Sequence, residues 1–347
     1  MHRFRLRAGW AALAVVLVAA GCKWTGFNDP AARSAATSAR NWLVTQQQAG
    51  GGFEVSGFDG FETPDAILAI AEEAQQQVAW NKGQARTAVK AVKISGKSAT
   101  NWADDFADGA LTAGQAAKLV ALVAKPLGYS VTSFNPDGDA GVRDLLATID
   151  AAAQPDGSYG AFNATLYAAL AKRLVNGSVP ASTLAYIRAA QEASGGWNYA
   201  ADSSGAFADV DTTSLAIQAL VAAKVARTDT DLVEGVQYLA DQHRASGAWQ
   251  SFGSDDPNST STAILAITAI GENPAQACWR DRAARVFVGT PYSSPVAWLG
   301  GQVASDGHIA SPNDAFPPVN TFATSQGIQA LRRGWLPAIV LNPLTCP

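Results

Sequence analysis

The sequence predicts an all-α fold in which six helical hairpins form a closed ring. One three-part unit recurs along the chain: a helix, a glycine-rich turn that carries an aromatic residue, and a second helix. The first helix of each pair is amphipathic, whereas the second is apolar on nearly all sides and should be covered on both faces. We therefore expect an inner ring of second helices surrounded by the first helices. No stretch alternates at a period of two residues for long enough to predict a sheet.

The clearest copy of the unit spans residues 184–223, where a helical run ends at Gln191, the turn carries Trp197 and an apolar helix starts at Asp211. The first pair is divided by the glycines at 50–52, and Pro64 suits the first turn of a helix. The basic stripe of the third helix is typical of a solvated face. In chain order, the pairs are predicted at 31–48 and 63–76, 82–94 and 112–125, 140–154 and 164–175, 184–191 and 211–223, 229–244 and 260–270, and 295–304 and 320–333, with an additional helix at 275–288.

The composition fits one large domain. The chain has 347 residues, of which 48% are hydrophobic, so it can bury a substantial core. Its net charge of -4 gives no electrostatic footprint for nucleic acid.

The N-terminus reads as an export signal with a lipid anchor. Arg3, Arg5 and Arg7 precede a short apolar run at 8–20, which is too short to predict a membrane span. The run ends in Leu-Val-Ala-Ala-Gly-Cys, which resembles a bacterial lipobox and predicts cleavage before Cys22 and diacylation of that cysteine. We expect a signal peptide at 1–21, a lipidated tether at 22–30, and one toroid domain at 31–347 on the outer side of a bacterial membrane. The alternative is an ordinary secretory signal with a chance cysteine.

Two further cysteines remain in the mature chain, Cys278 and Cys346. An exported chain meets an oxidising compartment, so the two thiols predict one disulfide. It would hold the C-terminal tail at 342–347 against the helix near Ala275. Two free buried thiols are the alternative.

The turns carry a family resemblance. The segment from Gln191 through Gly195 to Trp197 matches the Gln-x3-Gly-x-Trp repeat of squalene cyclases and related prenyltransferase-like toroids. The resemblance extends over residues 34–336 and implies a single (α/α)6 barrel. The repeat implies a structural role, in which the amide bonds leftover backbone groups and the aromatic ring packs between hairpins. The residues that match are Gln47 with Phe53, Gln154 with Tyr159, Gln191 with Trp197, His243 before Trp249, and Gln302 before His308, where His308 would replace the aromatic residue.

Polar residues stand at the start of each second helix. Asp, Asn and Thr are ordinary N-caps, and the helix dipole favours acids there. If the inner helices run parallel, however, their starts meet at one rim and form a ring of polar groups around an apolar hollow, as in many small-ligand sites. The candidate ligand-binding residues are Glu62, Asp65, Asn163, Thr165, Asp209, Asp211, Asn258, Thr262, Asn320 and Thr324.

One of these starts, Asp209-Val-Asp211-Thr212-Thr213, resembles the Asp-x-Asp-Asp-Thr motif of class II terpene cyclases. In that family the middle Asp is held protonated and protonates an alkene or epoxide, which needs a raised pKa and an apolar cavity. By position this acid would be Asp211, and Asp209 would match the first Asp. Thr212 stands in place of the final Asp.

The main hypothesis from the sequence is a lipid-anchored toroid that binds a small amphipathic or apolar ligand without chemistry, with a membrane importer as a candidate partner. The chain also resembles the secreted cobalamin carriers, which makes a corrinoid-like ligand one candidate. The alternatives are a class II cyclase-like isoprenoid enzyme that uses Asp211 as its acid, and an envelope protein that contacts other proteins. We expect no cofactor, and no His or Cys is spaced to complete a zinc site with His243 or His308.

Overall fold

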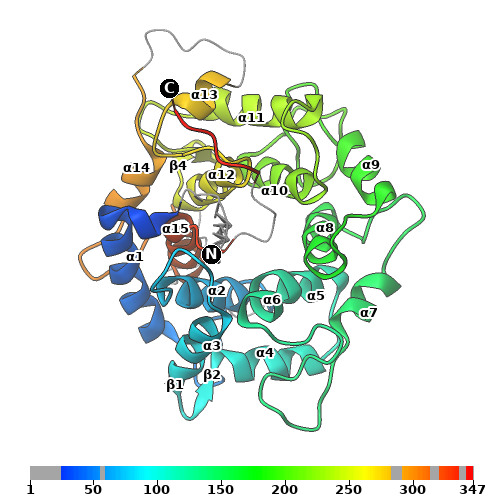
Figure 1. Ribbon diagram of the computed structural model, residues 1–347, viewed down its shortest axis with the longest axis vertical. Helices are drawn as coiled ribbons and strands as arrows, with labels where there is room; N and C mark the ends of the chain where they lie inside the picture. The colour runs from blue at the N-terminus through cyan, green and yellow to red at the C-terminus, as the bar shows by residue number, and fades with distance from the viewer. Residues whose placement is uncertain (1–24, 55–58, 283–290, 313–319, 336–340, 347) are drawn as a thin grey trace, which may run out of the picture.

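Six apolar helices form the inner ring of a computed structural model, which describes residues 25–54, 59–282, 291–312, 320–335 and 341–346. Each inner helix packs against the next along the chain, and the last packs against the first, so that within the described residues the ring is closed (Figure 1). The all-α toroid expected from the sequence is confirmed. The inner helices are α2 (Thr63–Glu73), α5 (Ala113–Leu119), α8 (Phe162–Asn176), α10 (Val210–Ala222), α12 (Pro257–Ala269) and α15 (Thr321–Arg332).

The amphipathic helices cover this ring from outside, and two of them lie between neighbouring inner helices. Helix α1 packs against both α15 and α2, and α14 packs against α12 and α15. The outer helices are α1 (Pro30–Leu43), α3 (Lys82–Ala91), α4 (Ala99–Asp108), α7 (Leu145–Ala151), α9 (Ala181–Ala189), α11 (Thr230–Gln242) and α14 (Pro295–Gly301), and α13 (Cys278–Arg282) lies against α11.

Short elements complete the described part of the chain. The strand pairs are two residues long, which agrees with the absence of a predicted sheet. They are β1 (Lys93–Ile94) with β2 (Lys97–Ser98), and β3 (Gln250–Ser251) with β4 (Ser254–Asp255). Helix α5 continues through a π-helical segment, η3 (Val120–Ala124), into α6 (Lys125–Leu127), and single 3-10 turns stand at η1 (Gly26–Asn28) and η2 (Val44–Gln46).

Two predicted outer elements differ from the structure. No helix was predicted between residues 94 and 112, but residues 99–108 form α4, and Ser98 and Asn101 make a reciprocal capping box at its start. The helix expected at 140–154 is shorter, since Asp144 accepts a hydrogen bond from the Ala147 backbone at 2.8 Å and fixes the start of α7 there.

Each repeat turn packs against the outer helix of the next hairpin. Gly195 has φ +86°, and a Cβ at this position would lie 2.5 Å from the carbonyl oxygen of Glu234 in α11. Gly307 has φ +104°, and its Cβ would lie 2.4 Å from the carbonyl oxygen of Ser38 in α1. A side chain is therefore excluded both by backbone conformation and by space. The second of these contacts joins the last turn to the first helix and so helps to close the ring.

A threonine in the following inner helix anchors each of these turns. The backbone N–H of Trp197 donates to the Thr213 hydroxyl at 2.9 Å, and that of Trp249 donates to Thr260 at 3.0 Å. The same bond, at 2.8 to 2.9 Å, joins Phe53 to Thr63, Tyr159 to Thr165, and Ile309 to Thr324. Thr324 and Thr165, which were expected to face a ligand, are therefore buried scaffold residues.

This bond also corrects the register of two repeats. In the sixth, the residue bound to threonine is the buried Ile309, so the expectation that His308 fills the aromatic position is wrong. His308 instead lies against Trp42, with ring centroids 5.7 Å apart, and its Nδ1 pairs with Asp306 at 2.6 Å.

The glutamine positions differ in the same way. The Gln191 and Gln47 amides donate to the turn carbonyls of Gly195 and Gly51, at 2.7 and 2.8 Å. Gln154 is exposed, and its amide donates only to the nearby Ala152 carbonyl, at 3.0 Å. Counting back from the turn glycine, the position of Gln191 is filled by Ala153 in the third repeat and by Val303 in the sixth, one residue away from the expected Gln154 and Gln302.

Replacing Thr213 by valine tests the threonine anchor. The substitution keeps the shape but leaves the buried N–H of Trp197 without an acceptor, so we expect unfolding to become easier by about 1–3 kcal/mol. Urea denaturation followed by tryptophan fluorescence measures this difference. Valine at the exposed Thr228 should change stability by less than about 0.5 kcal/mol. Equal stability of the two variants would refute the anchoring role.

The first described segment, from Thr25, and the last, ending at Cys346, are held against the ring. Cys278 and Cys346 form the expected disulfide, with their Cα atoms 5.6 Å apart, and the tail also bonds α12 through Leu341 N to Ala269 O at 2.9 Å. Near the N-terminus, Thr25 is buried and Gly26 packs directly on Leu331 of α15, so part of the segment predicted as a tether contacts the ring. Cys22 and the predicted signal peptide lie outside the described residues.

None of the helices in the described ranges combines the length and the apolar character that crossing a bilayer requires.

Candidate functional site

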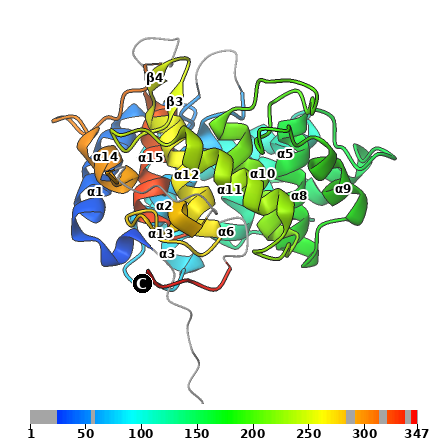
Figure 2. The same ribbon diagram turned by 90° about the horizontal axis from the view of Figure 1, so that it is seen from above.

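The inner helices place their N-termini on one side of the ring. Each is reached from an outer helix by a connection of the same sense, so the inner helices run parallel. Figure 2 shows β3 and β4, which directly precede α12, on one edge of the ring, and the C-terminal tail on the opposite edge. The ring of polar helix starts that the sequence suggested therefore has a structural basis.

These starts surround a cavity of about 680 Å³, a size typical of small-molecule sites. Its walls contain Leu122, Leu166, Leu170, Leu215 and Leu265, which come from α5 with its continuation, α8, α10 and α12. Aromatic side chains complete the lining: Phe61, Tyr167, Tyr199, Phe322 and Trp335. A mostly apolar wall with a few polar groups suits an apolar ligand that carries a small polar part.

Asp211 is the central polar group of this cavity. It lies in the first turn of α10, and its side chain is open to the cavity. Two hydroxyl groups from the neighbouring α12 orient its carboxyl group: Thr262 Oγ1 lies 2.9 Å from one oxygen and Ser259 Oγ lies 3.2 Å from the other. Sequence reasoning had placed Asp211 and Thr262 in separate repeats, and the structure brings them into direct contact.

The surroundings of Asp211 favour its protonated form. Burial within the ring raises the pKa of this carboxyl to about 7, and the negative charges of Asp209 and Asp256 act in the same direction, against the hydrogen bonds from Thr262 and Ser259. Asp211 therefore holds its proton to a higher pH than an ordinary aspartate. A carboxylic acid of this kind, facing an apolar cavity, can act as a general acid.

A second charged group lies across the ring from Asp211. Lys118 of α5 pairs with Asp65 of α2 at 2.6 Å, and both side chains are buried. Its ammonium also donates to the Phe61 carbonyl at 2.6 Å and lies 4.9 Å from the Phe61 ring centroid and 5.6 Å from that of Phe322. Burial lowers the pKa of Lys118, but the interactions with Asp65, Tyr167 and Glu54 together outweigh it, so the pKa lies above its ordinary value.

The remaining predicted residues divide into two groups. Asn163 and Asn258 line the cavity, and no described group bonds the Asn258 Oδ1 atom, although that atom is buried. Asp209 is the N-cap of α10 and accepts from the Thr212 backbone at 2.7 Å, so it acts on the cavity only through its charge.

Glu62 and Asn320 do not line the cavity. Glu62 is buried and accepts a hydrogen bond from Thr321 at 3.1 Å, which joins α2 to α15 where the ring closes. Asn320 stands at the N-cap position of α15 without a side-chain cap bond. The expectation that these two residues bind ligand, together with Thr324, is not met by the geometry.

Sequence reasoning missed several lining residues. Lys118 sits in the middle of an apolar helix, and only its spacing from the helix start could have indicated that it faces the hollow. Trp335 follows α15 and donates from Nε1 to the Ala121 carbonyl in the π-helical segment, at 3.1 Å. A π-helical segment leaves some backbone groups outside the regular hydrogen bonding of an α-helix. No sequence feature predicts such segments reliably.

Six inner helices inside a layer of outer helices define the class of fold: this is an (α/α)6 toroid, and solved structures share it. The sequence matches no known protein-family profile and no curated protein. Among solved structures, the chain is similar to the type II terpene cyclase MstE from Scytonema. The complex with the product merosterolic acid A has a TM-score of 0.58 at 13% identity, over 88% of this chain and 97% of that one.

A variant of the same enzyme in complex with its substrate, geranylgeranyl dihydroxybenzoate, has a TM-score of 0.61 at 13% identity, over 89% of this chain and 98% of that one. The apo enzyme has a TM-score of 0.57 at 14% identity, over 87% of this chain and 97% of that one. At such identity these similarities establish the shared fold.

Proposed function

We propose that this chain is a class II terpene cyclase-like enzyme, in which Asp211 protonates the alkene of an isoprenoid substrate. The observation that carries the proposal is a carboxyl group with a pKa of about 7 at the wall of a largely apolar cavity. The similarity to MstE, whose complexes hold a geranylgeranylated substrate and its product, supports a prenylated ligand over the corrinoid-like one.

The chemistry needs few groups. The Asp211 O–H proton adds to the CH carbon of the last trisubstituted alkene in the chain and leaves a tertiary cation on the neighbouring carbon, which carries two methyl groups. An internal alkene of the same chain then attacks this cation and closes a ring. Loss of a proton from the final cation restores charge balance, and the Asp211 carboxylate regains a proton from solvent. The apolar walls exclude water that would otherwise trap the cation.

The Asp65–Lys118 pair gives the cavity a polar end. Two of the three ammonium protons of Lys118 are accounted for by Asp65 and the Phe61 carbonyl, which leaves one for a ligand. We infer that the substrate carries an oxygen-bearing head at this side and extends its isoprenoid chain toward Asp211. Since α5, which carries Lys118, is two places from α10 in the ring, the two ends of such a molecule would contact different walls of the cavity.

Incubation with a set of prenylated substrates tests the function. Squalene, geranylgeranyl diphosphate and a geranylgeranylated hydroxybenzoic acid differ in the head group and share the alkene chemistry. We expect cyclised products, with the same mass as the substrate and fewer double bonds, from at least the substrate with a carboxylate head. If every substrate is bound and recovered unchanged, the carrier hypothesis, which uses the same cavity, replaces this one.

The pH dependence follows from the protonation state of Asp211. Because the acid form reacts, the rate should fall as pH rises through about 7. The Asp209→Asn variant keeps the N-cap but removes the negative charge that raises the pKa of Asp211, so the midpoint should move down by roughly half a pH unit. Asp202→Asn, in the exposed loop before α10, should leave the midpoint unchanged. A midpoint that is the same in both variants would contradict the assignment of the acid.

Export and lipidation at Cys22 remain a proposal from the sequence. The Cys278–Cys346 disulfide supports an oxidising compartment. A lipid anchor would also keep the cavity close to the bilayer in which apolar isoprenoids dissolve.

A further inference from the structure

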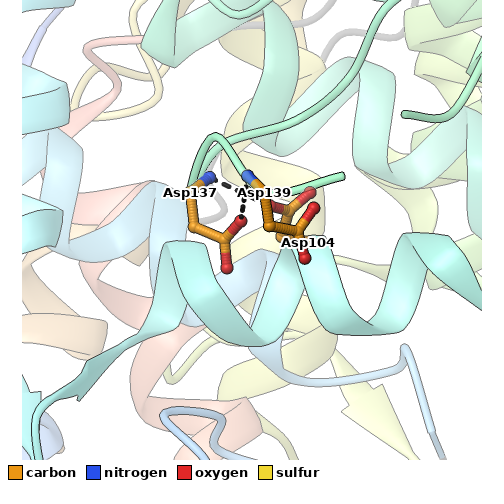
Figure 3. A group of neighbouring side chains, drawn as sticks. All are labelled: Asp104, Asp137 and Asp139. Carbon is orange, nitrogen blue, oxygen red and sulfur yellow. Dashed lines mark hydrogen bonds between the residues drawn. The ribbon is translucent and has the colours of Figure 1, made fainter. Parts of the chain in front are cut away.

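Three carboxylates meet on the outer wall of the ring, away from the cavity. Asp104 comes from α4, whereas Asp137 and Asp139 come from the loop at 128–144 that connects α6 to α7. One oxygen from each lies within 4.8 Å of the others (Figure 3). Like charges at this distance repel unless a proton or a cation lies among them.

The loop is fixed over α4 in this position. The Asp137 backbone N–H donates to Asp104 Oδ2 at 2.9 Å, and the Arg143 Nε donates to the Ala107 carbonyl at 2.7 Å. Further along the loop, the Asp139 backbone N–H donates to Asp137 Oδ1 at 3.3 Å. The carboxylates are thus brought together by bonds that do not themselves neutralise their charge.

Asp104 has a buried oxygen without a partner. Its side chain is only 1% exposed, and no described group makes a hydrogen bond to Oδ1. Removing a carboxylate oxygen from water without a replacement bond is costly, so this atom calls for a ligand. The exposed Asp137 and Asp139 leave the group open to solvent on the other side, which gives an ion a route of entry.

No described basic side chain forms an ion pair with these three residues. Two lysines on this wall have other partners: Lys97 pairs at 2.6 Å with Asp105, and Lys90 donates to the Pro136 carbonyl at 3.0 Å. The group therefore carries an excess of negative charge that the rest of the wall does not balance.

We propose that Asp104, Asp137 and Asp139 bind a calcium ion that ties the loop at 128–144 to α4. Calcium takes six to eight oxygen ligands in flexible geometry, and carboxylates, backbone carbonyls and water all serve. Asn135, Asp137 and Asp139 also have the one-three-five spacing with which calcium loops present their first ligands, although Ala140 stands where such loops usually have glycine. Magnesium is less suitable, because it demands near-ideal octahedral geometry and dehydrates reluctantly.

Thermal unfolding of the full chain with calcium tests the site. An affinity of about 0.1–1 mM is typical of extracellular calcium modules, so 10 mM calcium chloride should raise the Tm by about 3 °C or more over a chelator control. Magnesium chloride at the same concentration should raise it by less than half as much. Terbium, which replaces calcium, should show emission sensitised by nearby tryptophan, such as Trp102 of α4.

The control separates this site from general charge effects. Asp104→Asn should abolish both the Tm shift and the terbium emission, whereas Asp105→Asn, one residue along the same helix and with the same charge change, should retain both. Asp137→Asn provides a second test if Asp104→Asn does not fold. Two results would overturn the proposal. One is the absence of a calcium-dependent Tm shift in the wild-type chain, which would leave a shared proton as the neutralising species. The other is an equal Tm shift in the Asp104 and Asp105 variants. Because the site lies outside the cavity, neither result bears on cyclisation.

Discussion

Asp211→Asn is expected to reduce product formation by a factor of about 100 to 10,000, the usual contribution of a positioned general acid. Asparagine has nearly the same shape; its Oδ1 can accept a hydrogen bond from one of the two hydroxyls of Thr262 and Ser259, and its Nδ2–H can donate to the other. It has no acidic proton to deliver to an alkene. Ligand binding should therefore persist while the chemical step fails. Product quantified by mass spectrometry, together with a binding titration, separates these two effects.

The pH dependence of folding stability provides an internal control for the Asp211→Asn variant. Because the pKa of Asp211 is raised, the folded state binds more protons than the unfolded state between about pH 4 and 7, and stability falls as pH rises over that range. The asparagine variant lacks this loss and should be more stable than the wild type above pH 7, by about 1 kcal/mol after allowance for screening by water in the cavity. Product formation that is unchanged in Asp211→Asn would remove Asp211 as the acid. The binding hypothesis would then be favoured.

Trp197→Ala is expected to destabilise the ring by about 3–5 kcal/mol, the range for loss of a large buried aromatic residue. The Trp197 side chain is fully buried, and its Nε1 donates to the Ile187 carbonyl of α9 at 2.7 Å. It also meets α11 so closely that a Cβ on Gly235 would lie 2.8 Å from the ring. One side chain thus joins three neighbouring helices, α9, α10 and α11, and its removal leaves a cavity among them.

Urea denaturation measures this loss, and Phe207→Ala is the matched control. Phe207 lies in the same connection before α10, but 76% of its surface is exposed, so its truncation should change stability by less than about 0.5 kcal/mol. Trp249 makes the equivalent bond to the Leu239 carbonyl at 2.8 Å, and Trp249→Ala should cost a similar amount. If truncation at Trp197 is as mild as at Phe207, the repeat aromatics do not hold the scaffold.

The site could be predicted from sequence only in part, and the reason is visible in single residues. Asp211 and Thr262 were found because polar residues at helix starts are a local pattern. Thr324 shares that pattern but turns toward the Ile309 backbone, because the inner face of a helix depends on its rotation in the ring. Lys118 has no local pattern of its own and acquires its role from Asp65, which is 53 positions earlier in the sequence. The carboxylate group at Asp104 was missed because only histidine and cysteine spacings had been considered for metals.

Periodicity and repetition in the sequence determined the architecture. Apolar helices alternate with amphipathic ones, and each repeat turn requires a glycine such as Gly195. Both features depend on residues that are neighbours along the chain. Tertiary structure alone decided which polar groups meet. The raised pKa of Asp211 depends on Asp256 and on burial inside a closed ring, and the negative charge around Asp104 depends on a loop more than 30 residues further along the chain. Electrostatic interactions act through space, so their partners are set by how the ring closes and not by the order of the residues.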